Sequence, residues 1–264
     1  MRDNDESESD DNIRCASGKA RLYVAEDLFV GAALTLDKDQ SHYLVNVLRM
    51  GPGGRVLLFN GRDGEWAAEI SEALRKSAHL LVTAQTRKFE PLPDIWLLFA
   101  PVKKARLDFI AQKATEMGAS LIQPVITRRT IVARVKDQRL AANVVEAAEQ
   151  CGLVAVPQVR EAEKLSVVLD HWEQENPDRL ILFCDEAAPP GGALETLAAI
   201  ARDHPRGTPF ALLVGPEGGF DEEERAKLLK HQGTRPLSLG PRIMRADTAA
   251  IAALAAVQLI LGDW

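Results

Sequence analysis

Apolar residues follow two different rhythms along this chain, and the change between them divides it into two regions. From Arg21 to about Lys88 they come in short runs separated by turn-rich segments, which is typical of short strands joined by tight turns. After Pro93, buried-looking apolar runs alternate with amphipathic stretches of helical length. The segment Phe89–Pro93 contains two prolines, which resist both helix and ladder, and we interpret it as a linker.

The first region predicts one helix among several strands. In Gln40–Met50 the apolar residues recur at helical spacing. The runs that follow predict strands at Arg55–Phe59, Glu65–Ile70 and His79–Thr86. Short strands with tight connections favour a small β-barrel.

The second region predicts an α/β fold. The expected strands are Ile95–Val102, Leu121–Ile126, Leu180–Cys184 and Phe210–Val214. The expected helices are Leu107–Met117, Leu140–Cys151, Ala193–Arg202, Asp221–His231 and Thr248–Leu261. Such alternation favours a largely parallel sheet covered on both faces.

Charge is distributed unevenly along the chain, which has a net charge of −6. Residues 1–11 contain six acids and one arginine, and we expect the polar stretch 1–18 to be a disordered tail. Residues 101–139 contain nine Lys or Arg and three acids. This basic segment fits either a solvated face or a surface that binds nucleic acid.

Composition excludes several classes of protein. The three cysteines, Cys15, Cys151 and Cys184, are too widely spaced for a CxxC metal site or a disulfide framework, so we expect no metal and a reducing cytosol. Cys151 and Cys184 have apolar neighbours and are expected to be core thiols. The N-terminus has no apolar secretory stretch, and the run from Thr248 to Leu261 is too short to span a bilayer.

A glycine-rich turn follows the expected strand Phe210–Val214. It reads Gly215-Pro-Glu-Gly-Gly-Phe220 and precedes Asp221, which with Glu224 has the spacing of a capping box. Such a turn at the end of a strand lets a ligand approach the backbone, although a simple tight turn explains the same residues. It is neither a GxGxxG nor a Walker motif.

A second turn precedes the last helix. Leu239-Gly-Pro-Arg-Ile-Met-Arg245 carries two arginines at the helix start, and Asp247 or Thr248 is placed to cap the helix. Packing alone does not select two cations in such a loop. The small residues that follow allow the last helix to pack closely.

Together these turns and three upstream segments resemble the SPOUT methyltransferases, and specifically the small-subunit ribosomal RNA uridine-N3 methyltransferase family. The matching segments, in order, are His42–Arg49, Lys103–Gly118, Glu146–Gly152, Leu213–Phe220 and Leu239–Ala250. Two positions depart from the family pattern: Asp247 stands where glutamate is usual, and Met244 where leucine is usual.

The resemblance implies a C-terminal SPOUT α/β domain with a deep trefoil knot and an N-terminal PUA-like β-barrel domain that holds RNA. The implied boundaries are 1–18 for the tail, 19–90 for the barrel and 91–264 for the methyltransferase domain. It also implies a cytoplasmic homodimer that uses S-adenosyl-L-methionine and acts on ribosomal RNA or the small ribosomal subunit.

The resemblance also implies which residues carry the function. Cofactor binding is implied for Leu213, Val214, Gly215, Gly218, Gly219, Leu239, Gly240, Ile243, Met244 and Thr248. Our hypothesis for catalysis is that Arg245, with Arg242 nearby, stabilises negative charge on the uracil, while Asp247 or Glu217 removes a proton or serves a purely structural role. RNA contacts are expected from Arg49, Lys103, Lys104, Arg106, Arg128 and Arg129.

Other functions are also consistent with the sequence. One is ribose 2′-O methylation, whose usual Asn-x-Gly-x-x-x-Arg element is not found here. Another is an RNA-binding assembly factor without catalysis, which the two glycine turns and Arg245 disfavour. A small-molecule α/β enzyme accounts for neither the basic segment nor the first region.

Overall fold

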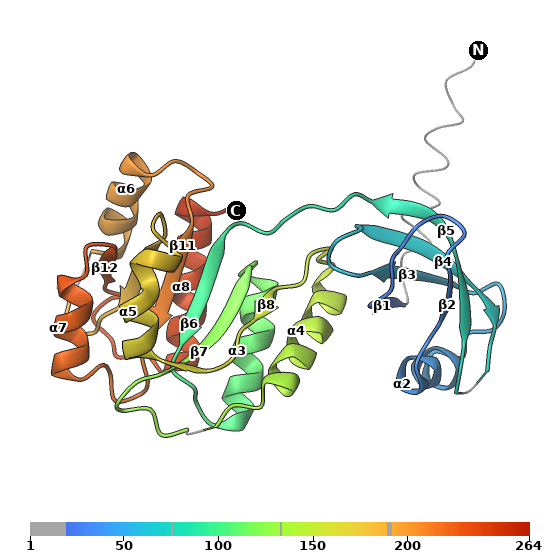
Figure 1. Ribbon diagram of the computed structural model, residues 1–264, viewed down its shortest axis with the longest axis horizontal. Coiled ribbons are helices and arrows are strands. Elements are labelled where there is room, and N and C mark those ends of the chain that lie inside the picture. The colour runs from blue at the N-terminus through green and yellow to red at the C-terminus, as the bar shows by residue number, and fades with distance from the viewer. Residues whose placement is uncertain (1–19, 75, 133, 189–191) are drawn as a thin grey trace, which may run out of the picture. The chain divides into compact units, whose positions relative to one another are not determined.

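The computed structural model describes residues 20–74, 76–132, 134–188 and 192–264, so the tail expected at 1–18 lies outside the described residues (Figure 1). The chain divides into two compact units. One consists of the described residues up to Pro91 together with Ala148–Val156, and the other of Leu92–Ala147 and Pro157–Trp264. The sequence pattern gave no sign that Ala148–Val156 groups with the N-terminal unit.

The N-terminal unit is a five-stranded sheet with a helical segment. Its elements are β1 (Arg21–Tyr23), β2 (Ala33–Thr35), α2 (Lys38–His42), η1 (Tyr43–Val47), β3 (Arg55–Phe59), β4 (Glu65–Glu72) and β5 (His79–Arg87). The strand order is β1-β3-β4-β5-β2, in which β1 is parallel to β3 and the other ladders are antiparallel. The three expected strands are confirmed. The expected helix is present, but its second half, η1, is a π-helix.

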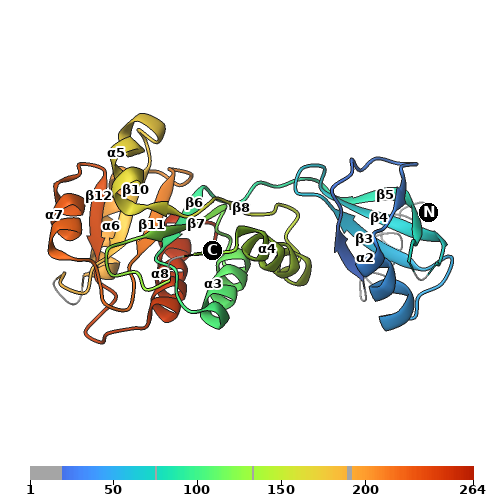
Figure 2. The ribbon, with the colours of Figure 1, turned by 60° about the horizontal axis from the view of Figure 1, so that its bottom comes forward.

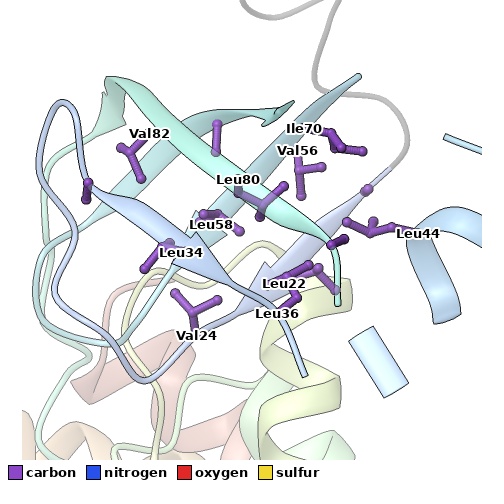
Figure 3. Close-up of a cluster of buried hydrophobic side chains, with 14 of the residues drawn as sticks. Leu22, Val24, Leu34, Leu36, Leu44, Val56, Leu58, Ile70, Leu80 and Val82 are labelled. Carbon is purple, nitrogen blue, oxygen red and sulfur yellow. The ribbon is translucent and has the colours of Figure 1, made fainter. Parts of the chain in front are cut away.

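Alternating side chains build one core inside this unit. On β3, Val56 and Leu58 point inward, and on β5, Leu80 and Val82 do so. Figure 3 shows these side chains converging with those of the neighbouring strands and with Leu44 from η1. The period of two therefore fixes which face of each strand is buried.

Arg21 ties the segment Ala148–Val156 to the sheet within this unit. Its Nε donates to the Glu65 carboxylate at 2.7 Å, and its Nη1 donates to the Ala148 carbonyl oxygen at 2.7 Å. The guanidinium also lies 3.8 Å from the centre of the Phe59 ring. Only 13% of the Arg21 side chain and 6% of the Glu65 side chain are exposed, so this is a largely desolvated ion pair.

The second unit is a parallel sheet with helices on both faces, as the sequence predicted (Figures 1 and 2). Its strands are β6 (Ile95–Phe99), β7 (Leu121–Ile126), β8 (Gln158–Val159), β9 (Glu163–Lys164), β10 (Leu180–Cys184), β11 (Phe210–Val214) and β12 (Thr234–Leu237). Its helices are α3 (Lys104–Glu116), α4 (Asp137–Cys151), α5 (Leu165–Glu175), α6 (Ala193–Asp203), α7 (Glu222–Lys230) and α8 (Ala246–Leu261). The strand order is β12-β10-β11-β6-β7-β8, with β9 paired to β7, and every ladder is parallel.

Alternate residues of the central strands face opposite helix layers. Trp96 of β6 packs with Trp172 of α5, with the two ring centroids 6.1 Å apart, in the same buried cluster as Leu228 of α7. On the other face α3 and α6 both pack against α8. Both tryptophan side chains are buried. No helix in the described ranges is both long and apolar enough to cross a membrane.

Three details of the sequence interpretation were wrong or incomplete. Helix α8 begins at Ala246 with Arg245 in the N-cap position, so neither Asp247 nor Thr248 caps it, and Asp247 accepts a hydrogen bond only from the adjacent Thr248 amide. Cys151 is exposed, because it ends α4 on the outward side. Helix α5 was missed, although its buried residues recur at helical spacing.

We predict that Arg21→Met destabilises the protein far more than Arg55→Met. Removing Arg21 leaves Glu65 buried without its cation, which costs about 3–5 kcal/mol. Arg55, also on this sheet, pairs with Glu69 at 3.5 Å on the exposed surface, where a pair contributes less than about 1 kcal/mol. Urea unfolding measures the free energy of unfolding of both variants. An equal decrease in the two would contradict a stabilising role for the buried pair of Arg21 and Glu65.

Candidate functional site

A cavity of about 380 Å³ lies where three neighbouring parallel strands end. Its walls come from the segments after β10, β11 and β12, together with the first turns of α8. Because β12, β10 and β11 are adjacent and parallel, their carboxyl ends meet at one edge of the sheet. This is where open α/β sheets bind ligands, and the volume is within the ~300–1,000 Å³ usual for small-molecule sites.

The turn after β11 is shaped by two glycines. Gly219 has φ +68°, and a Cβ there would lie 2.6 Å from Oε1 of Glu186. At Gly215 a Cβ would lie 3.1 Å from the Phe220 ring, which packs edge-on against Phe183. A Cβ at either glycine would therefore force the neighbouring side chain to move, and the backbone of this turn forms the cavity wall.

The turn after β12 forms the opposite wall. Gly240 has φ +107°, a conformation that favours glycine. After it, Ile243 is 86% exposed and Met244 is half-buried, and both line the cavity. The small residues Ala246 and Ala249 at the start of α8 line it as well, so the space is not filled by the helix.

The third wall, after β10, carries the acids of the cavity. The side chain of Asp185 is 3% exposed and accepts hydrogen bonds from Nε and Nη2 of Arg225 at 3.0 and 2.8 Å. Hydrogen bonding to Asp185 raises the pKa of Arg225. Glu186 lines the cavity beside Gly219, and burial raises the pKa of the Cys184 thiol to about 12, which keeps it neutral.

Sequence reasoning found two of the three walls. Of the expected cofactor-binding residues, those that line the cavity are Val214, Gly215, Gly219, Leu239, Gly240, Ile243 and Met244. Leu213, Gly218 and Thr248 do not line it. The segment Cys184–Ala188 was missed, although a carboxyl pair directly after an expected strand was a usable signal.

The expected catalytic residues lie around the cavity, outside its lining. Arg245 is exposed at the N-cap position of α8, and Glu217 is exposed in the turn after β11. Arg106 of α3 joins two of the carboxylates, lying 3.4 Å from Glu217 and 3.7 Å from Asp247. The structure thus brings Glu217 and Asp247 to one guanidinium, although they come from different turns.

Three arginines expected to contact RNA hold the segment after β11 in this structure. Besides Arg106, Arg128 forms ion pairs with Asp221 at 2.9 Å and Glu223 at 2.5 Å, and Arg129 donates to the Gly218 carbonyl oxygen at 2.7 Å. The predicted capping box of Asp221 and Glu224 is present. Hydrogen bonding to the Glu224 amide, and then the Arg128 guanidinium, lower the pKa of Asp221.

The other residues expected to contact RNA form fewer interactions within the protein. Lys103 is exposed at the N-cap position of α3, and Arg49 is exposed in the N-terminal unit with φ +56°. The side chain of Lys104 lies outside the described part of the structure. Lys113 and Glu116 of α3 form an ion pair with each other at 2.7 Å.

Comparison with known proteins identifies both regions of the chain. Residues 89–258 match the model of an RNA methyltransferase domain, and residues 36–83 match that of an RNA methyltransferase PUA domain. A protein of Rickettsia conorii named Ribosomal RNA small subunit methyltransferase E is 30% identical, with 91% of this chain and 95% of that protein covered. Its namesake in Synechocystis is 33% identical over 91% of this chain and 78% of that protein.

Solved structures agree with this assignment. The structure of a putative methyltransferase from Legionella pneumophila with bound SAM has a TM-score of 0.80 and 31% identity, and covers 92% of this chain and 98% of that one. A Ribosomal RNA small subunit methyltransferase E from Neisseria gonorrhoeae, bound to S-adenosyl methionine, has a TM-score of 0.79 and 30% identity, and covers 93% and 99%. This chain therefore belongs to the RNA methyltransferase family, with a parallel α/β methyltransferase domain and a PUA-like domain.

Proposed function

We propose that this chain methylates N3 of a uridine in small-subunit ribosomal RNA, with S-adenosyl-L-methionine as the methyl donor. The observation that carries the proposal is the cavity at the ends of β10, β11 and β12. It lies in the matched methyltransferase domain of a chain whose relatives are named for small-subunit ribosomal RNA.

The residues of the cavity fit this cofactor. Backbone at Gly215, Gly219 and Gly240 offers amide and carbonyl groups without side chains in the way, and Leu239 and Met244 supply apolar surface for an adenine ring. Glu186 suits a ligand that carries positive charge, whereas Asp185 is already paired with Arg225. When bound, the cofactor supplies an electrophilic methyl group on a sulfonium.

The chemistry at N3 requires the chain to handle a proton and a developing negative charge. N3 carries the imino proton on the pairing edge of uracil, so the base must be unpaired and the proton removed. We assign charge stabilisation to Arg245, with Arg242 from the cavity lining beside it. Glu217 and Asp247 are the proton acceptors available, and Arg106 positions both.

RNA is held by the cations around this site and by the PUA-like domain. Lys103 makes no ion pair within the described residues and is available for a phosphate. Arg106, Arg128 and Arg129 must give up a carboxylate or carbonyl partner before they reach one. Lys104 and Arg49 complete the proposed set.

The resemblance to SPOUT enzymes extends the proposal to the fold and the assembly. The turns around 215–219 and 239–245 form a deep trefoil knot, which is a rare exception to the rules of chain connection. The chain works as a homodimer in the cytoplasm, with residues 19–90 as the PUA-like barrel and 91–264 as the methyltransferase domain.

The direct test is transfer of labelled methyl from S-adenosyl-L-methionine to naked ribosomal RNA and to small subunits. Nucleoside mass spectrometry should find 3-methyluridine, and a 2′-O-methylated product would contradict the proposed reaction.

Arg245→Ala should lower the turnover rate about 10²–10³-fold, because it removes charge stabilisation in the transition state, while cofactor affinity stays unchanged. Full turnover in this variant would exclude that role.

We predict that Gly219→Ala weakens cofactor binding on the order of tenfold or more, as measured by calorimetry. The new Cβ must displace the Glu186 carboxylate, which lies 2.6 Å away in the cavity. Gly207→Ala is the matched control, because Gly207 also has a positive φ, +91°, but nothing lies within 4 Å of its Cβ position. If both variants lose cofactor affinity equally, backbone strain at a positive φ explains the loss, and the displacement of Glu186 in the cavity does not.

Lys103→Ala should flatten the dependence of RNA binding on salt. Loss of one phosphate contact lowers the slope of log K against log salt by about 0.7–0.9. Lys230→Ala, at an exposed position at the end of α7 and outside the proposed set, should leave the slope unchanged. Titrations of RNA at several salt concentrations measure both variants, and an unchanged slope for Lys103→Ala removes this residue from the interface.

A further inference from the structure

Arg49 has a backbone conformation that costs free energy. With φ +56° it is the one residue other than glycine in the left-handed region among the described residues. An L-residue with a long side chain loses about 1–2 kcal/mol there, and such strain persists where something compensates for it.

The side chain of Arg49 gives no compensation within the protein. It is exposed, and no hydrogen bond, ion pair or ring contact to it is found in the described ranges. By contrast, Arg21 and Arg62 of the same unit both form ion pairs, at 2.7 and 2.5 Å. The strain at Arg49 therefore presents an unpaired cation to solvent.

The residues before Arg49 form a second irregular feature. The π-helix η1 has the Leu48 amide donating to the Tyr43 carbonyl oxygen at 2.9 Å, and the Met50 amide then donates to the Leu44 carbonyl oxygen at 2.9 Å. Single π-turns occur frequently at functional sites. Two uncommon backbone features therefore follow each other directly.

Packing fixes which side of this segment faces outward. Leu44 is fully buried in the core of the unit, and Val45, Leu48 and Met50 pack against that core. Figure 3 shows Leu44 pointing into the cluster. The outward side then carries Tyr43, 37% exposed, and Val47, 57% exposed, with the exposed His42.

The segment around Arg49 carries no acid of its own. Residues 42–54 contain no Asp or Glu, although the chain has 38 acids, and Arg49 is their one Lys or Arg. The nearest acid before them in sequence, Asp39, is in the first turn of α2. An exposed aromatic ring and an unpaired guanidinium are the groups that bind single-stranded nucleic acid.

We propose that the outward side of η1 and Arg49 binds an unpaired segment of the RNA substrate. Tyr43 stacks on a base, and Arg49 contacts the flanking phosphate. The inference rests on the proposed function and deepens the contact proposed there for Arg49: it adds base stacking by Tyr43 and a preference for unpaired nucleotides. In a duplex the faces of the bases are stacked on one another and are inaccessible to Tyr43. A duplex could therefore interact with this surface only through a phosphate at Arg49.

Arg49→Asn and Tyr43→Ala in the full chain test this contact. Asparagine tolerates the left-handed region, so Arg49→Asn should melt no lower than the wild type while it loses the cation. Both variants should bind naked small-subunit ribosomal RNA and a single-stranded ribo-oligonucleotide on the order of tenfold more weakly. Arg49→Asn should also lower the salt slope by about 0.7. Arg55→Asn, at an exposed arginine of the same sheet, is the control and should bind as the wild type.

The comparison with a fully paired duplex decides the class of ligand. Binding of the duplex should change much less than binding of the single strand in Tyr43→Ala, and equal losses would overturn the assignment to unpaired RNA. Weaker binding to assembled subunits with unchanged binding to naked RNA would instead indicate a ribosomal protein as the partner and overturn the inference.

Two further outcomes separate this inference from the proposed function. If the wild type methylates ribosomal RNA and both variants keep its RNA affinity at every salt concentration, the inference is wrong and the proposed function stands. If the wild type neither methylates nor binds ribosomal RNA, the proposed function fails and the inference fails with it.

Discussion

The site depends on the close approach of glycine backbone to neighbouring side chains at the ends of three parallel strands. β10, β11 and β12 end side by side, and the turns that follow β11 and β12 must reverse direction without filling the space between them. Gly219 achieves this at φ +68°, where a side chain would collide with Glu186. A bulkier turn would remove the cavity and keep the sheet, so the fold and the site are separable.

The arginines around the cavity hold the turn that forms its wall, and they are also the proposed contacts to RNA. Arg106 lies between Glu217 and Asp247, and Arg128 and Arg129 hold the segment between Gly218 and Glu223. An RNA phosphate and these protein acceptors compete for the same guanidinium groups. In the proposed RNA complex, binding at this edge would perturb the turn that forms the cavity, which gives a physical route for coupling between RNA and cofactor.

Two arginines of the N-terminal unit, Arg21 and Arg49, differ in their surroundings. Arg21 is buried, paired with Glu65 and fixed to the segment Ala148–Val156, so its role is to hold the unit together. Arg49 is exposed, strained and without a partner in the part of the chain described. The same residue type thus stabilises the unit in one place and, in our proposal, contacts an external ligand in the other, and burial distinguishes the two.

The sequence by itself determined the strand–helix alternation, the two glycine turns and the capping box, because these depend on local periodicity and on conformations that few residues adopt. It did not determine the third cavity wall at Cys184–Ala188, because the order of parallel strands places β10 between β11 and β12. Nor did the sequence show that Arg106 forms an ion pair with Asp247. The two residues are separated by 140 residues, and pairing over such a distance in sequence follows from tertiary packing. Tertiary structure alone decided which arginines of the described residues form ion pairs, because segments distant in sequence meet only through packing.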